Sequence, residues 1–308
     1  MPLNSYNLTE KTLKGRLPEV LGQVIFVDSS TGNANGDGSS QRPFSSISSA
    51  MLKSGLSSGD AIVCLPGHVE TVSAASGIGL NIAGISIIGM GAGASRPTVT
   101  LDTAATATIA VSAANVSIKN IVFTANFADI VSLFTTTNAN NFKLDNCYFK
   151  ATATNMNFLN IVDTDATTGN ASGLTIVNSK WIEPDTATDS LVKMDGTNAD
   201  ILIEGNFLQL GVKNNTASVM AVAAGKVVTN LQIISNRVFR LNTDTATGAI
   251  LFSTNGSTNS GIVANNFVQH ADVAAELLIT ASSGLGTFSN FASGVAGASG
   301  YVLPAIDS

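Results

Sequence analysis

The sequence has little charge and few aromatic residues. Charged residues make up 12% of the 308 positions and aromatic residues 6%, while apolar residues make up 44%. So large an apolar share at so low a charge excludes a disordered, highly charged chain and favours a strand-rich folded one. The net charge of -6 has no local cluster of Lys and Arg to offset it, so we expect no nucleic-acid partner.

Long apolar runs are missing as well. No stretch approaches the roughly 18 apolar residues that a membrane helix requires. The first 23 residues carry Lys11, Lys14 and Arg16, but no apolar run follows these charges as it would in a secretory signal. We therefore expect a protein that is made in a cytoplasm without a signal peptide and has no membrane partner.

Cysteine is rare and its two copies stand far apart. Cys64 follows Ala-Ile-Val, and Cys147 precedes Tyr-Phe, so both lie in apolar surroundings. No third or fourth ligand lies near either of them. We interpret both as free thiols of the core rather than a disulfide or a metal pair, and we expect no metal and no cofactor.

What the sequence does contain is a repeat of about thirty residues. Six segments share the pattern apolar-x-apolar-x-turn-x-x-apolar, and an earlier partial copy begins at Ile85. Their first residues are Val116, Phe142, Leu174, Ile201, Leu231 and Gly261. A fixed period of this size is typical of a solenoid, in which each unit buries its apolar face only by stacking on the next.

The repeat predicts two or three short strands per coil, one of which lies halfway to the next copy. Apolar residues alternate over the first three positions, as in a half-buried strand, and a Gly, Asn or Ser then turns the chain. The apolar residue after the turn points back inside. We therefore predict an all-β fold, a right-handed parallel β-helix whose coils stack at the strand spacing of about 4.8 Å.

Asparagine recurs at the turn of each copy. Its side chain tolerates a left-handed backbone, and its amide can bond to the same residue in the coils above and below. We predict two stacked Asn columns. The first comprises Asn120, Asn146 and Asn178, and the second Asn206, Asn236 and Asn266.

The repeat divides the chain into four segments. We expect an N-terminal attachment arm over residues 1–23, a strand, loop and capping helix over 24–60, the β-helix coils over 61–291 and a C-terminal tail over 292–308. Pro43 is placed at the start of the capping helix, whose apolar face would carry Phe44, Ile47 and Met51. The helix would cover the first coil and the tail would strap the last one.

The start of the chain resembles a known superfamily. The resemblance lies in Phe26-Val-Asp28, Gly36-Asp-Gly38, Pro43 to Ala50 and Ser58 to His68, which in this order are similar to the opening of pectate-lyase-like parallel β-helix proteins. The looser coil pattern extends it to about Phe291. It implies the fold, but function only weakly, because this fold serves polysaccharide lyases, hydrolases, phage tailspikes and inert virion proteins.

The sequence does not show the cluster of acidic and basic residues that a polysaccharide-cleaving enzyme of this fold would need. Lys119 and Asp145 share an outward column, which predicts a cross-strand ion pair. Asp163 and Asp195 each follow the second strand, the one halfway between copies, in adjacent coils, and two carboxylates about 5 Å apart would suit a retaining glycosidase. We favour ordinary loop acids and expect no catalytic residues, with this pair as the alternative.

Two further candidates also have simpler interpretations. The loop from Asn33 to Gly38 has oxygen ligands and glycines, but its spacing is not that of the calcium-binding loop and predicts a plain turn. His68 and His270 stand alone, with no Ser or Cys constellation around them. We assign neither histidine a catalytic role.

These observations predict a non-enzymatic structural protein of a bacteriophage virion, either a head decoration or a fibre-like surface subunit. Its partners would be capsid or other virion proteins, bound through the arm. The alternative is a phage tailspike or adhesin that binds or cleaves host surface polysaccharide, and a secreted bacterial polysaccharide enzyme or adhesin is a third interpretation.

We also expect a homotrimer. Four outward residues of the later coils would form an apolar stripe: Val177, Leu202, Ile234 and Ile262. A C-terminal tail folded over the stripe is the alternative, through Val295, Tyr301, Val302 and Leu303.

Overall fold

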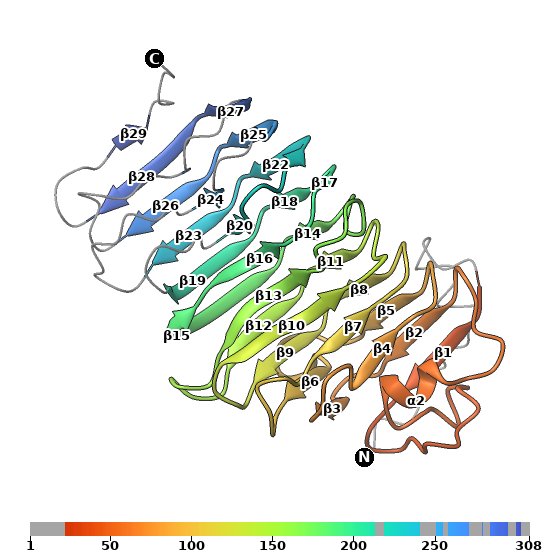
Figure 1. Ribbon diagram of the computed structural model, residues 1–308. Coiled ribbons are helices and arrows are strands. Elements are labelled where there is room, and N and C mark those ends of the chain that lie inside the picture. The colour runs from red at the N-terminus through yellow and green to blue at the C-terminus, as the bar shows by residue number, and fades with distance from the viewer. Residues whose placement is uncertain are drawn as a thin grey trace.

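The computed structural model describes residues 22–212, 219–240, 251–254, 258–270, 279, 284–294 and 300–302. Most of the expected attachment arm, residues 1–21, lies outside these ranges, as do Val295, Leu303 and the side chain of His270. The remaining segments form a stack of coils, with helix α2 at one end and strands β27 and β28 at the other (Figure 1).

Three sheets run along the stack. The first sheet has ten parallel strands. They are β1 (Val24–Val27), β2 (Ala61–Cys64), β5 (Ser86–Gly89), β8 (Ser117–Lys119), β11 (Lys143–Asp145), β14 (Thr175–Val177), β18 (Leu202–Glu204), β22 (Leu231–Ile234), β25 (Gly261–Ala264) and β27 (Leu285–Phe288).

The second sheet also has ten strands and the third has seven. The second comprises β3 (Val69–Val72), β6 (Thr98–Leu101), β9 (Val122–Ala125), β12 (Tyr148–Ala151), β15 (Lys180–Thr188), β19 (Phe207–Val212), β23 (Arg237–Arg240), β26 (Phe267–His270), β28 (Asn290–Gly294) and β29 (Gly300–Val302). The third comprises β4 (Ile78–Leu80), β7 (Ile109–Val111), β10 (Ile130–Thr136), β13 (Phe158–Thr164), β16 (Ser190–Met194), β20 (Met220–Val222) and β24 (Phe252–Ser253). Strands β17 (Asn198–Ala199) and β21 (Val228–Thr229) form a small pair of their own.

The coils that begin at β8, β11, β14, β18 and β22 pass from the first sheet through a tight turn into the second sheet, and then into the third. Within the coils all of the pairing is parallel, which confirms the predicted parallel β-helix. The apolar residue after each turn stacks in register on its equivalent in the next coil. This column comprises Phe123, Phe149, Trp181, Leu208, Val238 and Val268, all buried.

The turn residue of every copy has a left-handed backbone. Its φ is positive at Asn120, Asn146, Asn178, Gly205, Ser235 and Asn265. An L residue pays a steric penalty in this region, and glycine and asparagine pay the least, which explains why these types recur at this position. The turn thereby sets the register at which successive coils align.

A ladder of buried amides runs beside this turn. Asn206 donates through Nδ2 to Oδ1 of Asn236 at 3.0 Å, Asn236 donates likewise to Asn266 at 3.0 Å, and Asn266 to Asn290 at 2.9 Å. The same Oδ1 atoms also accept backbone N–H bonds. This second Asn column is confirmed as a ladder, but its members follow the left-handed residue rather than occupy it.

Helix α2 begins later than the sequence suggested. It spans Ile47–Met51 with Ser46 as its N-cap, and Ile47 and Met51 are buried in the core. Pro43 lies outside it, because Phe44 instead forms a parallel bridge with Val27. No helix in the described part of the chain has the length and apolarity needed to cross a membrane.

The C-terminal segment adds a strand to the second sheet. Strand β29 pairs antiparallel with β28, which places Tyr301 opposite Phe291. The described part of the expected tail therefore covers the edge of the last second-sheet strand. The alternative that the tail covers the first-sheet stripe depends on side chains outside the described part of the chain and stays a prediction.

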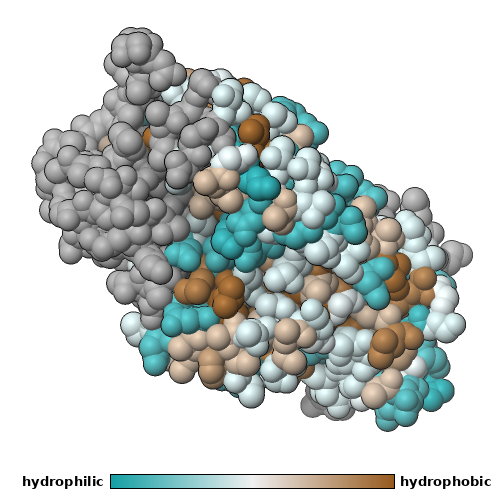
Figure 2. All heavy atoms as spheres, in the orientation of Figure 1, coloured by the Kyte–Doolittle hydropathy of each residue, from teal (hydrophilic) through white to brown (hydrophobic). Residues whose placement is uncertain are grey.

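The apolar stripe expected on the first sheet is interrupted. Leu202 and Ile262 share one outward column, but Gln232 stands between them. Val177 and Ile234 share the other column, with Glu204 between them. Figure 2 likewise shows apolar side chains in small scattered groups on the face it presents.

Candidate functional site

The outer side of the third sheet brings together the two acids that the sequence singled out. Asp163 lies in β13, and the residue in register with it on the neighbouring strand, β16, is Lys193. Asp195 follows β16 directly, two residues beyond Lys193. The two acids therefore lie on neighbouring coils but are not opposite one another, because the register places a lysine beside Asp163.

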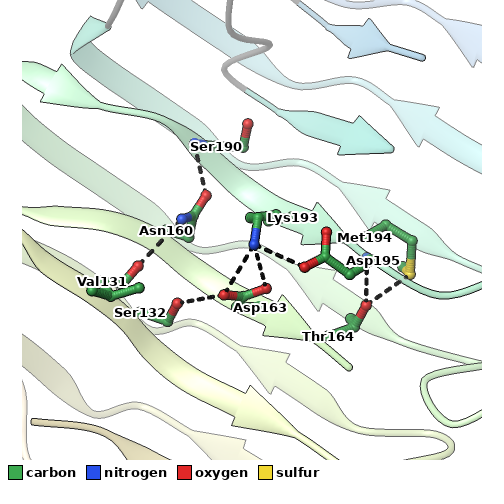
Figure 3. Close-up of polar contacts among 9 residues, drawn as sticks. All are labelled: Val131, Ser132, Asn160, Asp163, Thr164, Ser190, Lys193, Met194 and Asp195. Carbon is green, nitrogen blue, oxygen red and sulfur yellow. Dashed lines mark hydrogen bonds and ion pairs between the residues drawn. The ribbon is translucent and has the colours of Figure 1, made fainter. Parts of the chain in front are cut away.

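Lys193 joins the two carboxylates. Its Nζ lies 3.3 Å from Oδ1 of Asp163 and 2.8 Å from Oδ2 of Asp195 (Figure 3). Ser132 of β10 donates a further hydrogen bond, at 3.0 Å, to Oδ2 of Asp163. The backbone N–H of Asp195 donates to the hydroxyl of Thr164 at 3.0 Å, which holds the second acid at the end of its strand.

Burial and the ion pairs shift the pKa values of this group in opposite directions. Only 16% of the Asp163 side chain is exposed, and burial raises the pKa of this carboxyl above its ordinary value, although Lys193 and Ser132 act in the opposite direction. Burial by itself would lower the pKa of Lys193. The hydrogen bond to Asp195 and the negative charge of Asp163 outweigh it, so the pKa of Lys193 is raised and the lysine is protonated at neutral pH.

Small side chains flank the pair along the same outward column. Thr135 precedes Asp163 and Ala221 follows Lys193 in the register of the sheet. A retaining glycosidase, however, needs one carboxylate free to attack the sugar and one to protonate the leaving group. Here a single ammonium group lies between the two acids and is bonded to both.

Lys193 is the residue of this group that the sequence interpretation missed. The signal was present, since Lys193 is the one charged residue of the apolar strand Ser190–Met194 and so must point outward. The predicted pair of Lys119 and Asp145 is confirmed as a cross-strand ion pair, with 3.4 Å between Nζ and Oδ2.

The loop from Asn33 to Gly38 folds on its own hydrogen bonds. Asp37 accepts from the backbone N–H of Ser39 at 2.8 Å and forms an exposed ion pair with Arg42 at 3.5 Å. Asn33 accepts from the N–H of Asn35 at 2.8 Å, as in a turn. Among the described residues, no group of three or more His, Cys, Asp or Glu side chains is placed to hold a metal ion.

His68 and both cysteines belong to the interior. His68 is fully buried, and its Nε2 lies 3.5 Å from Oε2 of Glu70. Glu70 in turn accepts the backbone N–H of Ile47 at 2.7 Å, at the start of α2. Cys64 and Cys147 are free and buried, as predicted. Burial raises the pKa of both thiols, that of Cys147 to about 12.

Comparison with known proteins finds similarity at the level of structure. No protein-family model matches the sequence, and no curated protein matches it significantly. Among solved structures, the chain is similar to pectate lyase Pel9A, with 15% identity, a TM-score of 0.51, and 87% of this chain and 69% of that chain covered.

Two further structures have lower TM-scores. A rhamnogalacturonan lyase shares 13% identity over 87% of each chain, with a TM-score of 0.42. A tailspike protein of E. coli bacteriophage HK620 shares 11% identity over 80% of this chain and 53% of that one, with a TM-score of 0.43. At these identities the likeness to Pel9A establishes the fold, and function has to be argued from the site.

Proposed function

We propose that this chain, which has the pectate-lyase-like parallel β-helix fold, is a structural surface subunit of a bacteriophage virion that works without catalysis. The observation that carries the proposal is the position of Lys193 between Asp163 and Asp195. An ammonium bonded to both acids stands between the two carboxylates, where the scissile bond of a retaining glycosidase would have to lie. The group then serves to tie two coils together on the outside of the rod.

Rigidity along the rod supports the structural role. Every coil from Asn206 to Asn290 is joined to the next by a buried amide ladder whose donors and acceptors are paired. Fully satisfied buried networks make a core specific and stiff. A stiff rod of stacked coils suits a subunit that must hold its shape on the surface of a particle.

An apolar cluster outside the main core lies where the expected attachment arm joins the rod. Val24, Phe26, Val63 and Ile88 lie on the opposite side of β1, β2 and β5 from the core, and they form a separate buried cluster. The chain enters β1 beside this cluster at Gly22, whose N–H donates to the carbonyl of Gly59 at 2.8 Å. The preceding segment, residues 1–21, carries Leu3, Leu8, Leu13, Leu17 and Val20.

Deletion of residues 2–20 tests the proposal. The truncated chain should keep its β-rich circular dichroism spectrum and its melting transition but fail to enter particles. A matched control carries a Gly and Ser sequence of equal length in place of these residues and should fail in the same way. Normal incorporation of the folded truncated chain would contradict attachment through the arm.

The second candidate is a tailspike or adhesin that binds or cleaves host polysaccharide. Aromatic and cationic side chains in register on the outside of the second sheet, among them Tyr148, Lys180 and Arg237, favour a protein that binds polysaccharide over one that cleaves it.

A further inference from the structure

The outer side of the second sheet carries a column in which aromatic and cationic side chains are interspersed. Strand pairing from β12 to β28 aligns one outward residue of each strand. These residues are Tyr148, Lys180, Phe207, Arg237, Phe267 and Phe291, which we call the cation–aromatic column. Six strands at the usual sheet spacing make a column of about 24 Å.

Packing between neighbouring rings holds the column together. Phe239, from the adjacent outward column, fits between Phe207 and Phe267, with ring centroids 5.3 and 5.8 Å away. Phe267 and Phe291 are stacked with their ring planes 10° apart. The side chain of Phe291 is 39% exposed, and both Lys180 and Arg237 are exposed, so the column lies at the surface.

Lys180, one of the two cations of the column, rests on rings rather than on a carboxylate. The Nζ of Lys180 lies 5.4 Å from the ring centroid of Tyr148 and 5.3 Å from that of Phe207. Lys150, from the adjacent column, also lies over Tyr148, at 5.9 Å. None of these lysines, nor Arg237, forms a salt bridge within the described part of the chain. Cation–ring contact orients an ammonium without neutralising it, so these charges remain available to an anion.

The sign of its charge distinguishes this surface from the molecule as a whole. The chain as a whole carries -6. In contrast, the column and its neighbour have three cations, and the described neighbouring positions after Lys150 are neutral. These neighbours are Ile182, Gln209, Phe239 and Gln269. The partner that complements this surface is therefore negatively charged.

The spacing of the charges indicates what kind of anion fits. Lys180 and Arg237 stand two strands apart in one column, which separates them by about 10 Å along the rod. A separation of that order matches the carboxylates of a polysaccharide in which acidic and neutral sugars alternate. Gln209, between the two cations in the adjacent column, offers an amide to the hydroxyl groups of the intervening neutral sugar.

A nucleic acid fits this surface less well. Single-stranded nucleic acid is bound by ring faces on which bases stack and by a basic groove that follows every phosphate. Here Phe267 and Phe291 stack on each other through one face each, and Lys180 lies over one face of Tyr148 and one face of Phe207. Widely spaced charge is better matched by an anion of low charge density.

We propose that the cation–aromatic column binds an acidic polysaccharide lying along the rod, with Lys180 and Arg237 contacting successive carboxylates. This binding goes beyond the structural role proposed above and does not depend on it. A particle subunit with such a surface would adhere to a glycan coat without cleaving it.

Binding of the full-length protein to hyaluronan, a polymer of alternating glucuronate and neutral amino sugar, tests the proposal. Affinity gel electrophoresis should show binding that weakens with added salt. The double variant Lys180→Gln with Arg237→Gln should bind roughly tenfold more weakly or worse, since two charge-assisted contacts are lost. The exchanged variant Lys180→Arg with Arg237→Lys keeps both charges and should retain most of the binding.

A charge-matched control uses the first sheet. Lys119→Gln with Lys143→Gln removes the same two positive charges from another face and should leave binding unchanged, with melting curves confirming that all variants fold. Three outcomes would overturn the proposal: no binding of hyaluronan by the wild type, equal loss in both double variants, or equally tight binding of neutral dextran or of a thymidine oligonucleotide. None of these outcomes bears on whether truncation of residues 2–20 prevents incorporation into particles, so the two proposals fail independently.

Discussion

The side-chain amide of Asn236 donates to the Oδ1 atom of Asn266 at 3.0 Å, inside the solenoid. Asn236 also accepts, through its own Oδ1, both the side-chain and the backbone N–H of Asn206 at 3.0 Å. Its remaining amide hydrogen is taken by the carbonyl of Ile203 at 2.9 Å. One buried side chain thus joins three consecutive coils.

Replacement Asn236→Ala should therefore destabilise the protein strongly. It leaves the side-chain and the backbone N–H of Asn206 buried without their shared acceptor, and each such group costs about 1–3 kcal/mol. We expect a loss of roughly 3 kcal/mol or more, seen as a lower urea midpoint. Gln232→Ala, at a half-buried outward position of the same coil, should change the midpoint little. Similar midpoints for the two variants would argue against the ladder as a source of stability.

The ion pairs of Lys193 should make the stability of the folded protein depend on pH in the alkaline range. Because the pKa of Lys193 is raised in the folded state, its contribution is complete below the unfolded pKa of about 10.4. It is lost as the pH rises through the higher folded value. The urea midpoint of the wild type should thus fall more steeply above pH 10.5 than that of Lys193→Gln. Parallel curves would show that the pairs contribute nothing measurable.

Both thiols should be unreactive in the folded protein. Cys64 and Cys147 are buried, and burial raises their pKa values, so almost no thiolate is present at pH 8. Ellman's reagent should label neither cysteine over an hour in buffer and both in 6 M guanidinium chloride. Rapid labelling of the native protein would place one of them at a surface.

Self-association remains a prediction, and the register changes the best residue to test it. A lysine in place of Ile234 would lie opposite Glu204 and pair with it, whereas Ile262 is 38% exposed and lies opposite Gln232. Ile262→Lys should therefore dissociate a trimer to about one third of its mass in light scattering. A wild-type protein that is monomeric at micromolar concentration would contradict the prediction.

Sequence patterns predicted the coil well because its local chemistry is explicit. Asn120 and Asn146 sit where the backbone is left-handed, and Lys119 meets Asp145 as expected. The prediction that failed was the register of outward residues between coils of unequal length. Differences in length are absorbed in the loops, while the left-handed turn sets the register. Counting from the turn places Glu204 beside Ile234, which breaks the apolar stripe.

The group around Asp163 was harder to foresee for the same reason. Its strand follows a loop of variable length, so nothing in the sequence fixes whether Lys193 or Asp195 lies opposite it. The start of α2 depended on a long-range bridge between Phe44 and Val27, which outweighed the local preference of Pro43 for a first helical turn.

The central claim, that the group of Asp163, Lys193 and Asp195 is structural and the protein has no catalytic activity, is tested most directly by a turnover assay. Purified protein is incubated with capsular and cell-wall polysaccharides, and reducing ends and unsaturated products are measured over time. We predict no product above the level of a heat-denatured sample. Product formation that disappears in Asp163→Asn or Asp195→Asn, with folding intact, would contradict the account and identify the chain as a polysaccharide-cleaving enzyme.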